Sequence, residues 1–110
     1  MSKFFNIITV DTHILAQASD YSVFSTSNKR GLNNVTISKL IITNYNNISC
    51  TVKIWLDHAS GTDYYITGNI TIPAEGTLVW DTPFTFNVST HTLKLTNTSS
   101  GSARVSVIME

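Results

Sequence analysis

The sequence predicts an all-β fold, an antiparallel, jelly-roll-like β-sandwich of about seven or eight strands. Three observations predict it: apolar and polar residues alternate with a period of two, the alternating runs have the length of strands, and turn-forming residues separate them. The chain has 110 residues, a common size for one domain. We therefore expect one sandwich domain over residues 21–110, preceded by an N-terminal arm or edge strand over residues 1–20.

The N-terminal residues are compatible with more than one structure. Phe4 and Phe5 belong either to a first strand or to an apolar arm that docks on a neighbouring molecule. Residues 11–19 fit a short helical turn, an extended arm or an edge strand. Phe4 and Phe5 are therefore candidate interface residues.

The clearest alternation runs over residues 51–57, where Val52, Ile54 and Leu56 share one face. The opposite face then carries Trp55 between two charged side chains. A second segment, residues 35–43, is apolar on both faces around its middle, which is typical of a central strand in a sandwich. Shorter alternating runs complete the set at residues 83–88, 92–96 and 104–110.

Turn-forming residues separate the runs. Asparagine tolerates positive φ, so the Asn-rich segment 44–47 is expected to join two strands as a hairpin. Pro73 presets φ and Gly76 is free to adopt positive φ, which predicts a turn over residues 73–76. Further turns are expected at residues 58–62, 68–69 and 99–102.

The charge content argues against two classes of partner. Charged residues make up 13% of the chain, and seven basic residues balance seven acidic ones. A nucleic-acid-binding protein normally has a basic excess, and an anionic membrane surface attracts the same charge. We therefore expect neither partner. A low net charge also weakens self-repulsion, which suits either a subunit of an assembly or an uncharged monomer.

Cysteine content and the N-terminus bear on localisation. Cys50 is the only cysteine, so no disulfide can form within the chain. The short apolar run after Lys3 is interrupted by Asn6, which is unlike a secretory signal, and no apolar run reaches the length of a membrane span. We expect the protein to be made, and to stay, in a reducing cytoplasm.

Sequence patterns of enzymes and metal sites are missing. The histidines His13, His58 and His91 are far apart, and no pair has the spacing of metal ligands. No glycine-rich phosphate loop and no nucleophile elbow occurs. The sequence therefore predicts no enzyme, no cofactor and no metal.

One segment, residues 57–63, gathers Asp, His and Ser within a single turn. A catalytic triad needs a fixed relay geometry, which one hairpin rarely provides, so a polar turn is the favoured interpretation. Asp57 and Asp63 are an alternative pair of calcium ligands, although the segment lacks the ligand series of an EF-hand.

Aromatic residues are the main candidates for a binding surface. Trp55 should point outward, as an interface anchor, a stacking platform for sugar, or a ring covered by another part of the chain. Tyr64 and Tyr65 occupy adjacent positions, so one ring should face inward and the other outward. Trp80 lies among apolar residues and is expected in the core. Trp55, Tyr64 and Tyr65 join Phe4 and Phe5 as candidate interface residues.

The order of several segments resembles small virion structural proteins of tailed bacteriophages, including phages of marine bacteria and cyanobacteria. The resemblance covers roughly residues 20–110 and rests on the order of the segments rather than on one specific motif. It is carried by Val23–Ser27, Val35–Thr36, Leu40–Asn44, Val52–Asp57, Tyr64–Ile66, Ile70–Leu78, Thr92–Leu95 and Val105–Ile108.

The resemblance implies a β-sandwich without catalytic residues that is part of a virion and is made in the host cytoplasm. It implies a capsid decoration (cement) protein that binds the major capsid protein of the assembled shell, with a homo-oligomer, a trimer in preference, as its functional form. A neck, tail or baseplate component is the alternative within the same class. A carbohydrate-binding adhesin, with Trp55 and an outward tyrosine as its platform, is the alternative from another class.

Overall fold

The structure is a computed structural model and describes residues 2–8, 12–17, 19, 34–58, 60–97 and 104–110. It confirms the all-β fold. This part of the chain contains eleven strands, more than expected, because several are only three or four residues long and cannot be told from turns in the sequence. The strands are β1 (Lys3–Ile7), β2 (Thr12–Ala16), β3 (Asn34–Ile37), β4 (Leu40–Asn44), β5 (Cys50–His58), β6 (Asp63–Tyr65), β7 (Ile70–Ile72), β8 (Thr77–Trp80), β9 (Phe84–Asn87), β10 (His91–Asn97) and β11 (Val105–Met109).

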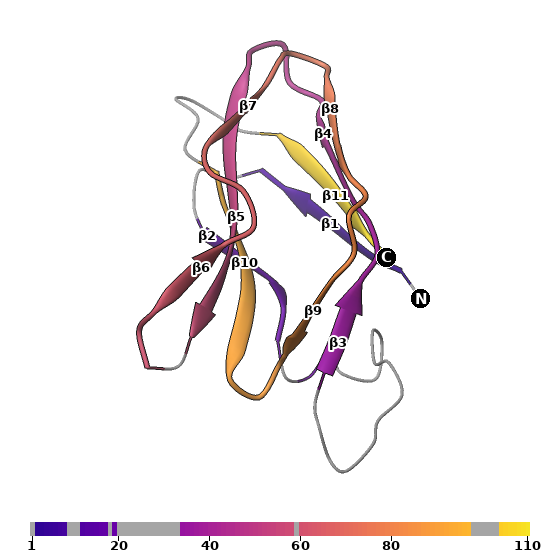
Figure 1. Ribbon diagram of the computed structural model, residues 1–110. Helices are drawn as coiled ribbons and strands as arrows, with labels where there is room; N and C mark the ends of the chain where they lie inside the picture. Colours follow the sequence, from indigo (N-terminus) through magenta and orange to yellow (C-terminus); the bar gives the residue numbers. More distant parts are fainter. Residues whose placement is uncertain (1, 9–11, 18, 20–33, 59, 98–103) are drawn as a thin grey trace.

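The strands form two main layers (Figure 1). One layer, here called sheet I, has the order β1-β11-β4-β8. The other layer, sheet II, has the order β2-β10-β5-β6, and β7 pairs with β5 beside β6. The small β3-β9 pair lies at one end of the sandwich (Figure 1). All pairings between strands are antiparallel.

The two N-terminal strands enter different layers. β1 pairs with β11 at the edge of sheet I, and β2 pairs with β10 at the edge of sheet II. The first sixteen residues therefore contribute one edge strand to each layer of the sandwich. Phe4 and Phe5 lie in β1, within the sheet.

Alternating burial places the core between the layers. Ile54 of β5 and Leu95 of β10 point inward from sheet II, while Ile42 of β4 and Val107 of β11 point inward from sheet I, and all four are fully buried. Trp80 is half-buried and packs against this core, as expected. Cys50 is buried. Apolar burial of this kind is the main source of stability in a sandwich without disulfides.

Cross-strand threonine pairs occupy part of the outer surface. Their hydroxyl oxygens lie within hydrogen-bond distance, at 2.7 Å to 3.4 Å. Such pairs stabilise adjacent strands without charge, which fits the low charged fraction of the chain. The pairs are Thr12–Thr96, Thr36–Thr85, Thr43–Thr77 and Thr51–Thr71.

The turn after β4 is organised by a buried side chain. Asn44 is fully buried, and its Nδ2 donates to the carbonyl oxygens of Ile48, Ile72 and Pro73 at 2.8 Å, 3.2 Å and 3.1 Å. Its Oδ1 accepts from the backbone N–H of Asn46 at 3.0 Å. The predicted Asn-rich turn is therefore present, but the expectation of a hairpin is wrong, because β4 lies in sheet I and β5 in sheet II, so the turn connects the two layers. Asn44 ties it to the β7–β8 turn.

The other predicted turns lie where expected or outside the described residues. Residues 58–62 connect β5 to β6, and residues 73–76 connect β7 to β8. Gly61 has φ of 99°, which glycine adopts without strain. The predicted turn at residues 99–102 and the segment Val23–Ser27 fall outside the described residues.

A candidate interaction face around Trp55

The outer face of sheet II carries aromatic, charged and hydroxyl side chains in contact with one another. Trp55 points outward from β5, as the alternation predicts, and is half-buried. It is paired with Tyr65 of β6 on one side and with Lys94 of β10 on the other. These residues, with Lys53, Asp57 and Thr96, are called the Trp55 face below.

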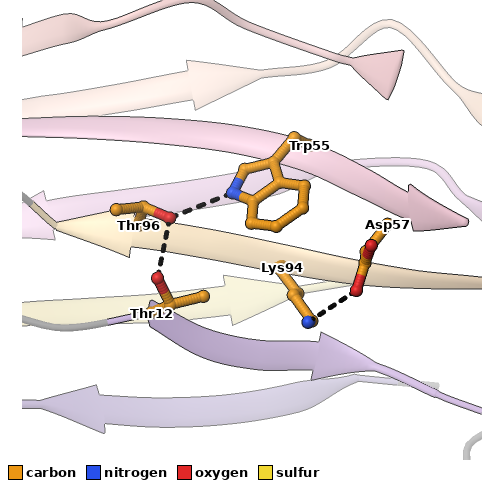
Figure 2. Close-up of polar contacts among 5 residues, drawn as sticks. All are labelled: Thr12, Trp55, Asp57, Lys94 and Thr96. Atoms are coloured by element: carbon orange, nitrogen blue, oxygen red, sulfur yellow. Dashed lines mark hydrogen bonds and ion pairs between the residues drawn. The ribbon is translucent and has the colours of Figure 1, made fainter. Parts of the chain in front are cut away.

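The Trp55 ring is held by neighbours on the adjoining strands. Its Nε1 donates to Thr96 Oγ1 at 3.0 Å, and the Thr96 and Thr12 hydroxyl oxygens are 3.1 Å apart (Figure 2). The Tyr65 ring centroid lies 6.4 Å from that of Trp55, with the planes tilted by 39°. The indole is therefore fixed in orientation while part of its surface stays accessible.

Two lysine ammonium groups approach the aromatic rings. Lys94 Nζ lies 5.4 Å from the Trp55 ring centroid, and Lys53 Nζ lies 5.2 Å from that of Tyr65. Cations at such distances are attracted by the negative face of an aromatic ring. Positive charge and aromatic surface are therefore presented together.

The Trp55 face also contains an ion pair between two of its residues. Lys94 Nζ donates to Asp57 Oδ2 at 2.7 Å (Figure 2). This hydrogen bond, together with the positive charge of Lys94, holds the pKa of Asp57 below its ordinary value of 3.8, although partial desolvation acts in the opposite direction. Asp57 is therefore an anion at neutral pH, already paired within the chain.

The Asp-His-Ser turn does not assemble a relay. The backbone N–H of Ser60 donates to His58 Nδ1 at 2.9 Å, and the Ser60 hydroxyl contacts the same nitrogen. The Asp57 carboxylate instead forms its ion pair with Lys94 Nζ, at 2.7 Å. No group of three or more potential metal ligands occurs among the described residues.

The two tyrosines lie on opposite sides of β6, but the expectation that one ring is inside is wrong. Tyr64 and Tyr65 are 53% and 57% exposed. β6 is a short strand at the edge of sheet II, so the side of β6 that faces inward is open to solvent. Tyr64 instead borders a cleft of about 420 Å³, which is lined by Leu56, Tyr64, Thr85, Phe86, Asn87 and His91.

Phe4 and Phe5 are separated from the Trp55 face. Phe5 points inward and packs against the core, with Lys3 Nζ 5.1 Å from its ring centroid. Phe4 is 71% exposed and points outward from sheet I, on the opposite side of the sandwich from Trp55. The candidate residues therefore belong to four places: the Trp55 face (Trp55 and Tyr65), the Tyr64 cleft, the outside of sheet I (Phe4) and the core (Phe5).

Sequence reasoning missed the neighbours of Phe4. The register of sheet I places Ile108, Ile41 and Val79 beside Phe4 in one row across the four strands. The sequence does contain a signal for this row: β4 and β11 each have consecutive apolar residues, and in a strand one of two consecutive side chains must point to the outer face.

No helix among the described residues is long and apolar enough to span a membrane.

No protein-family model matches the chain, and no curated protein matches it. Similar solved structures exist at low identity. The crystal structure of PirA is 12% identical, with a TM-score of 0.46, and covers 97% of this chain and 90% of that one. The Drosophila NLP core, described by its pentamer formation and histone binding, is 14% identical, with a TM-score of 0.47 and coverages of 99% and 96%.

A viral structure is also similar. The infectious bursal disease virus Gx strain structure is 12% identical, with a TM-score of 0.41, and this chain spans 33% of that one. These similarities concern an all-β, jelly-roll-like architecture alone. What the protein does has to be argued from its own surface.

Proposed function

We propose that this protein is a bacteriophage virion structural protein that binds the assembled capsid shell as a decoration (cement) subunit, and that it acts by binding rather than by catalysis. The observation that carries the proposal is the Trp55 face, where a fixed indole, a second aromatic ring and two lysines are presented on a flat sheet. Tryptophan and tyrosine side chains are enriched at protein interfaces and among the residues that contribute most to binding.

The resemblance to small phage virion proteins supports the same assignment. In this proposal the protein is made in the host cytoplasm and ends in the virion, and the major capsid protein is its partner. Removal of apolar area from water stabilises by about 25 cal/mol per Å², and many symmetric copies on a shell multiply a modest contact.

The test is an add-back experiment with particles that lack the gene. Purified protein should bind these particles and protect them against heat or chelation, whereas Trp55→Ser should bind much more weakly while keeping the melting temperature of a folded domain. Ile48→Ser is the matched control, since Ile48 is 44% exposed in the β4–β5 turn, outside the Trp55 face. Unfolding of Trp55→Ser, or binding equal to that of the parent, contradicts the assignment.

Copy number separates the shell from the alternative, a neck, tail or baseplate position. A decoration protein is present in hundreds of copies, whereas a tail component is present in about six to a few dozen. An electron-microscopy map of the particle gives both the position and the multiplicity of the chain.

A carbohydrate-binding adhesin is the second candidate function. The Trp55 and Tyr65 rings lie beside hydrogen-bonding groups on Asp57 and both lysines, which is the chemistry that stacks and anchors a sugar ring. Binding to a glycan array that Trp55→Ser abolishes supports this function. A silent array, together with loss of particle stability on gene deletion, dismisses it.

A further inference from the structure

The outer face of sheet I has an uncharged centre. One row across the four strands is apolar, Phe4–Ile108–Ile41–Val79, and is called the apolar row below. Phe4 and Val79 at its ends are 71% and 52% exposed. The next row, Asn6–Ser106–Thr43–Thr77, is polar but uncharged. Exposed apolar side chains in a continuous row do not stabilise a monomer, whereas covering them with another molecule removes their apolar surface from water. This face is therefore suited to binding another molecule.

Charged residues flank this centre. By alternation, Lys39 and Glu110 lie on the same face as the apolar row, one row further along the strands. They are hydrogen-bonded to each other through the backbone: Lys39 N–H donates to Glu110 O, and Glu110 N–H donates to Lys39 O. At the other end, Arg104 lies beside Tyr45, whose N–H donates to the Arg104 carbonyl oxygen at 3.0 Å. Lys39 and Glu110 thus place opposite charges on neighbouring chain segments at the same height along the sheet.

We propose that this face binds a second copy of the same chain. The two-fold axis of this pair lies midway between the two stacked sheets, parallel to the strands and above the boundary between β11 and β4. Such an axis places β11 of one copy on β4 of the other and β1 on β8, without shifting the rows. Ile108 then meets Ile41 of the second copy, and Phe4 meets Val79 of the second copy. Stacked sheets at the usual separation of about 10 Å bring these side chains into contact.

The same operation makes the charges complementary. Glu110 of each copy meets Lys39 of the other, which gives two symmetry-related pairs of opposite charge. Arg104 of each copy meets the Tyr45 ring of the other, a cation–aromatic pairing. A face that is self-complementary under a two-fold operation is what an isologous dimer requires. This match is the reason to choose a second copy as the occupant.

The size of the face sets the expected affinity. Four strands about 4.8 Å apart and four outward rows about 6.8 Å apart give a footprint of roughly 500 Å². A stable interface covers about 800 Å² on each partner, so the expected dimer is weak and depends on concentration. The inference is independent of the function proposed above, because the Trp55 face lies on the opposite side and remains exposed in the pair. A two-fold pair also differs from the trimer implied by the resemblance.

Sedimentation of the full chain over a range of concentrations tests the pairing. The parent should move from monomer to dimer as concentration rises. Lys39→Glu and Glu110→Lys should each weaken the dimer on the order of tenfold, because like charges then meet twice. Thr71→Lys, an exposed position on the outer face of sheet II, is the matched control and should pair like the parent.

A mixing experiment excludes effects within one chain. The Lys39→Glu chain carries two acids at these positions and the Glu110→Lys chain carries two bases, so a mixed pair restores opposite charges at both contacts. The equimolar mixture should therefore dimerise at concentrations at which each variant alone is monomeric. Circular dichroism melting confirms that both variants are folded. A mixture that stays monomeric, a parent that stays monomeric at millimolar concentration, or a parent that forms a trimer overturns the inference.

Discussion

Lys94 and Asp57 form an ion pair of 2.7 Å diagonally across the β10–β5 pairing, and the same ammonium lies 5.4 Å from the Trp55 ring centroid. One lysine thus connects the charged and aromatic parts of the Trp55 face. Its hydrogen bond and its charge lower the pKa of Asp57. The pH dependence of stability is the direct consequence that can be measured.

The stabilising effect of Asp57 should disappear in acid. The folded-state pKa of Asp57 lies below its ordinary value of 3.8, so its contribution is complete above pH 3.8 and is lost as pH falls through the folded-state pKa. Asp57→Asn should therefore be slightly less stable than the parent at pH 7 and equally stable in strong acid. Chemical denaturation of both proteins at several pH values measures this difference. A gap that persists at the lowest pH, or that widens there, contradicts the assignment of the pair.

Truncation of a central core residue should destabilise the sandwich strongly. Ile54 is fully buried between the layers, so Ile54→Ala removes apolar contacts and leaves a cavity. We expect a loss of about 2–5 kcal/mol in the free energy of unfolding, measured by denaturant titration. Ile14→Ala is the control, because Ile14 is 45% exposed on β2, and its effect should stay within about 1 kcal/mol. Equal effects at both positions would disprove the assignment of the core.

Removal of the Asn44 side chain should cost more than loss of an ordinary turn residue. Asn44→Ala leaves three carbonyl oxygens and one N–H without their present partners. Because these groups lie in or near the interior, we expect a loss of about 2–3 kcal/mol by denaturant titration. Asn47→Ala, at an exposed position of the same turn, should change stability by less than about 0.5 kcal/mol. The prediction fails when the two variants are equally stable.

A methyl group at Gly76 should disturb the β7–β8 turn. A Cβ at this position lies 2.8 Å from Pro73 Cγ and 3.1 Å from Pro73 O, closer than ordinary contact. The Gly76 carbonyl also accepts from Asn44 N–H at 2.9 Å, so a shift of the turn reaches the β4–β5 connection. Gly76→Ala should lower the melting temperature, with a cost of about 1–3 kcal/mol.

Gly68→Ala is the matched control for this substitution. A Cβ at Gly68 has no neighbour within 4 Å, and Gly68 does not have a positive φ. Its melting temperature should stay near that of the parent or rise slightly, since alanine restricts the unfolded chain. A large loss at Gly68 with none at Gly76 would show that close packing against Pro73 is not the determining factor.

Period-two patterns predicted the main sheets because burial on one face leaves a mark in the sequence. Residues 51–57 and 92–96 alternate in β5 and β10 as expected, and the doubly apolar segment 40–42 lies in β4, between β11 and β8. The outward position of Trp55 followed from the same argument. These features depend only on neighbours along the chain, which a sequence displays directly.

The features that were missed depend on partners distant in the chain. The placement of β1 and β2 in different layers follows from pairing with β11 and β10, about ninety residues later, and no local pattern encodes it. The exposure of Tyr64 follows from the position of β6 at an edge. The apolar row likewise appears only when four strands are placed in register. Local alternation predicts whether a side chain points inward or outward, but not which side chains from distant strands lie beside it.

The placement of β1 and β2 in separate layers also affects how the protein can fold during its synthesis on the ribosome. β1 and β2 are translated before their hydrogen-bonding partners, β11 and β10. β1 and β2 cannot pair in their sheets until β11 and β10 have emerged from the ribosome. We therefore expect the edges of β1 and β2 to stay unpaired in the nascent chain until then, with chaperones shielding them.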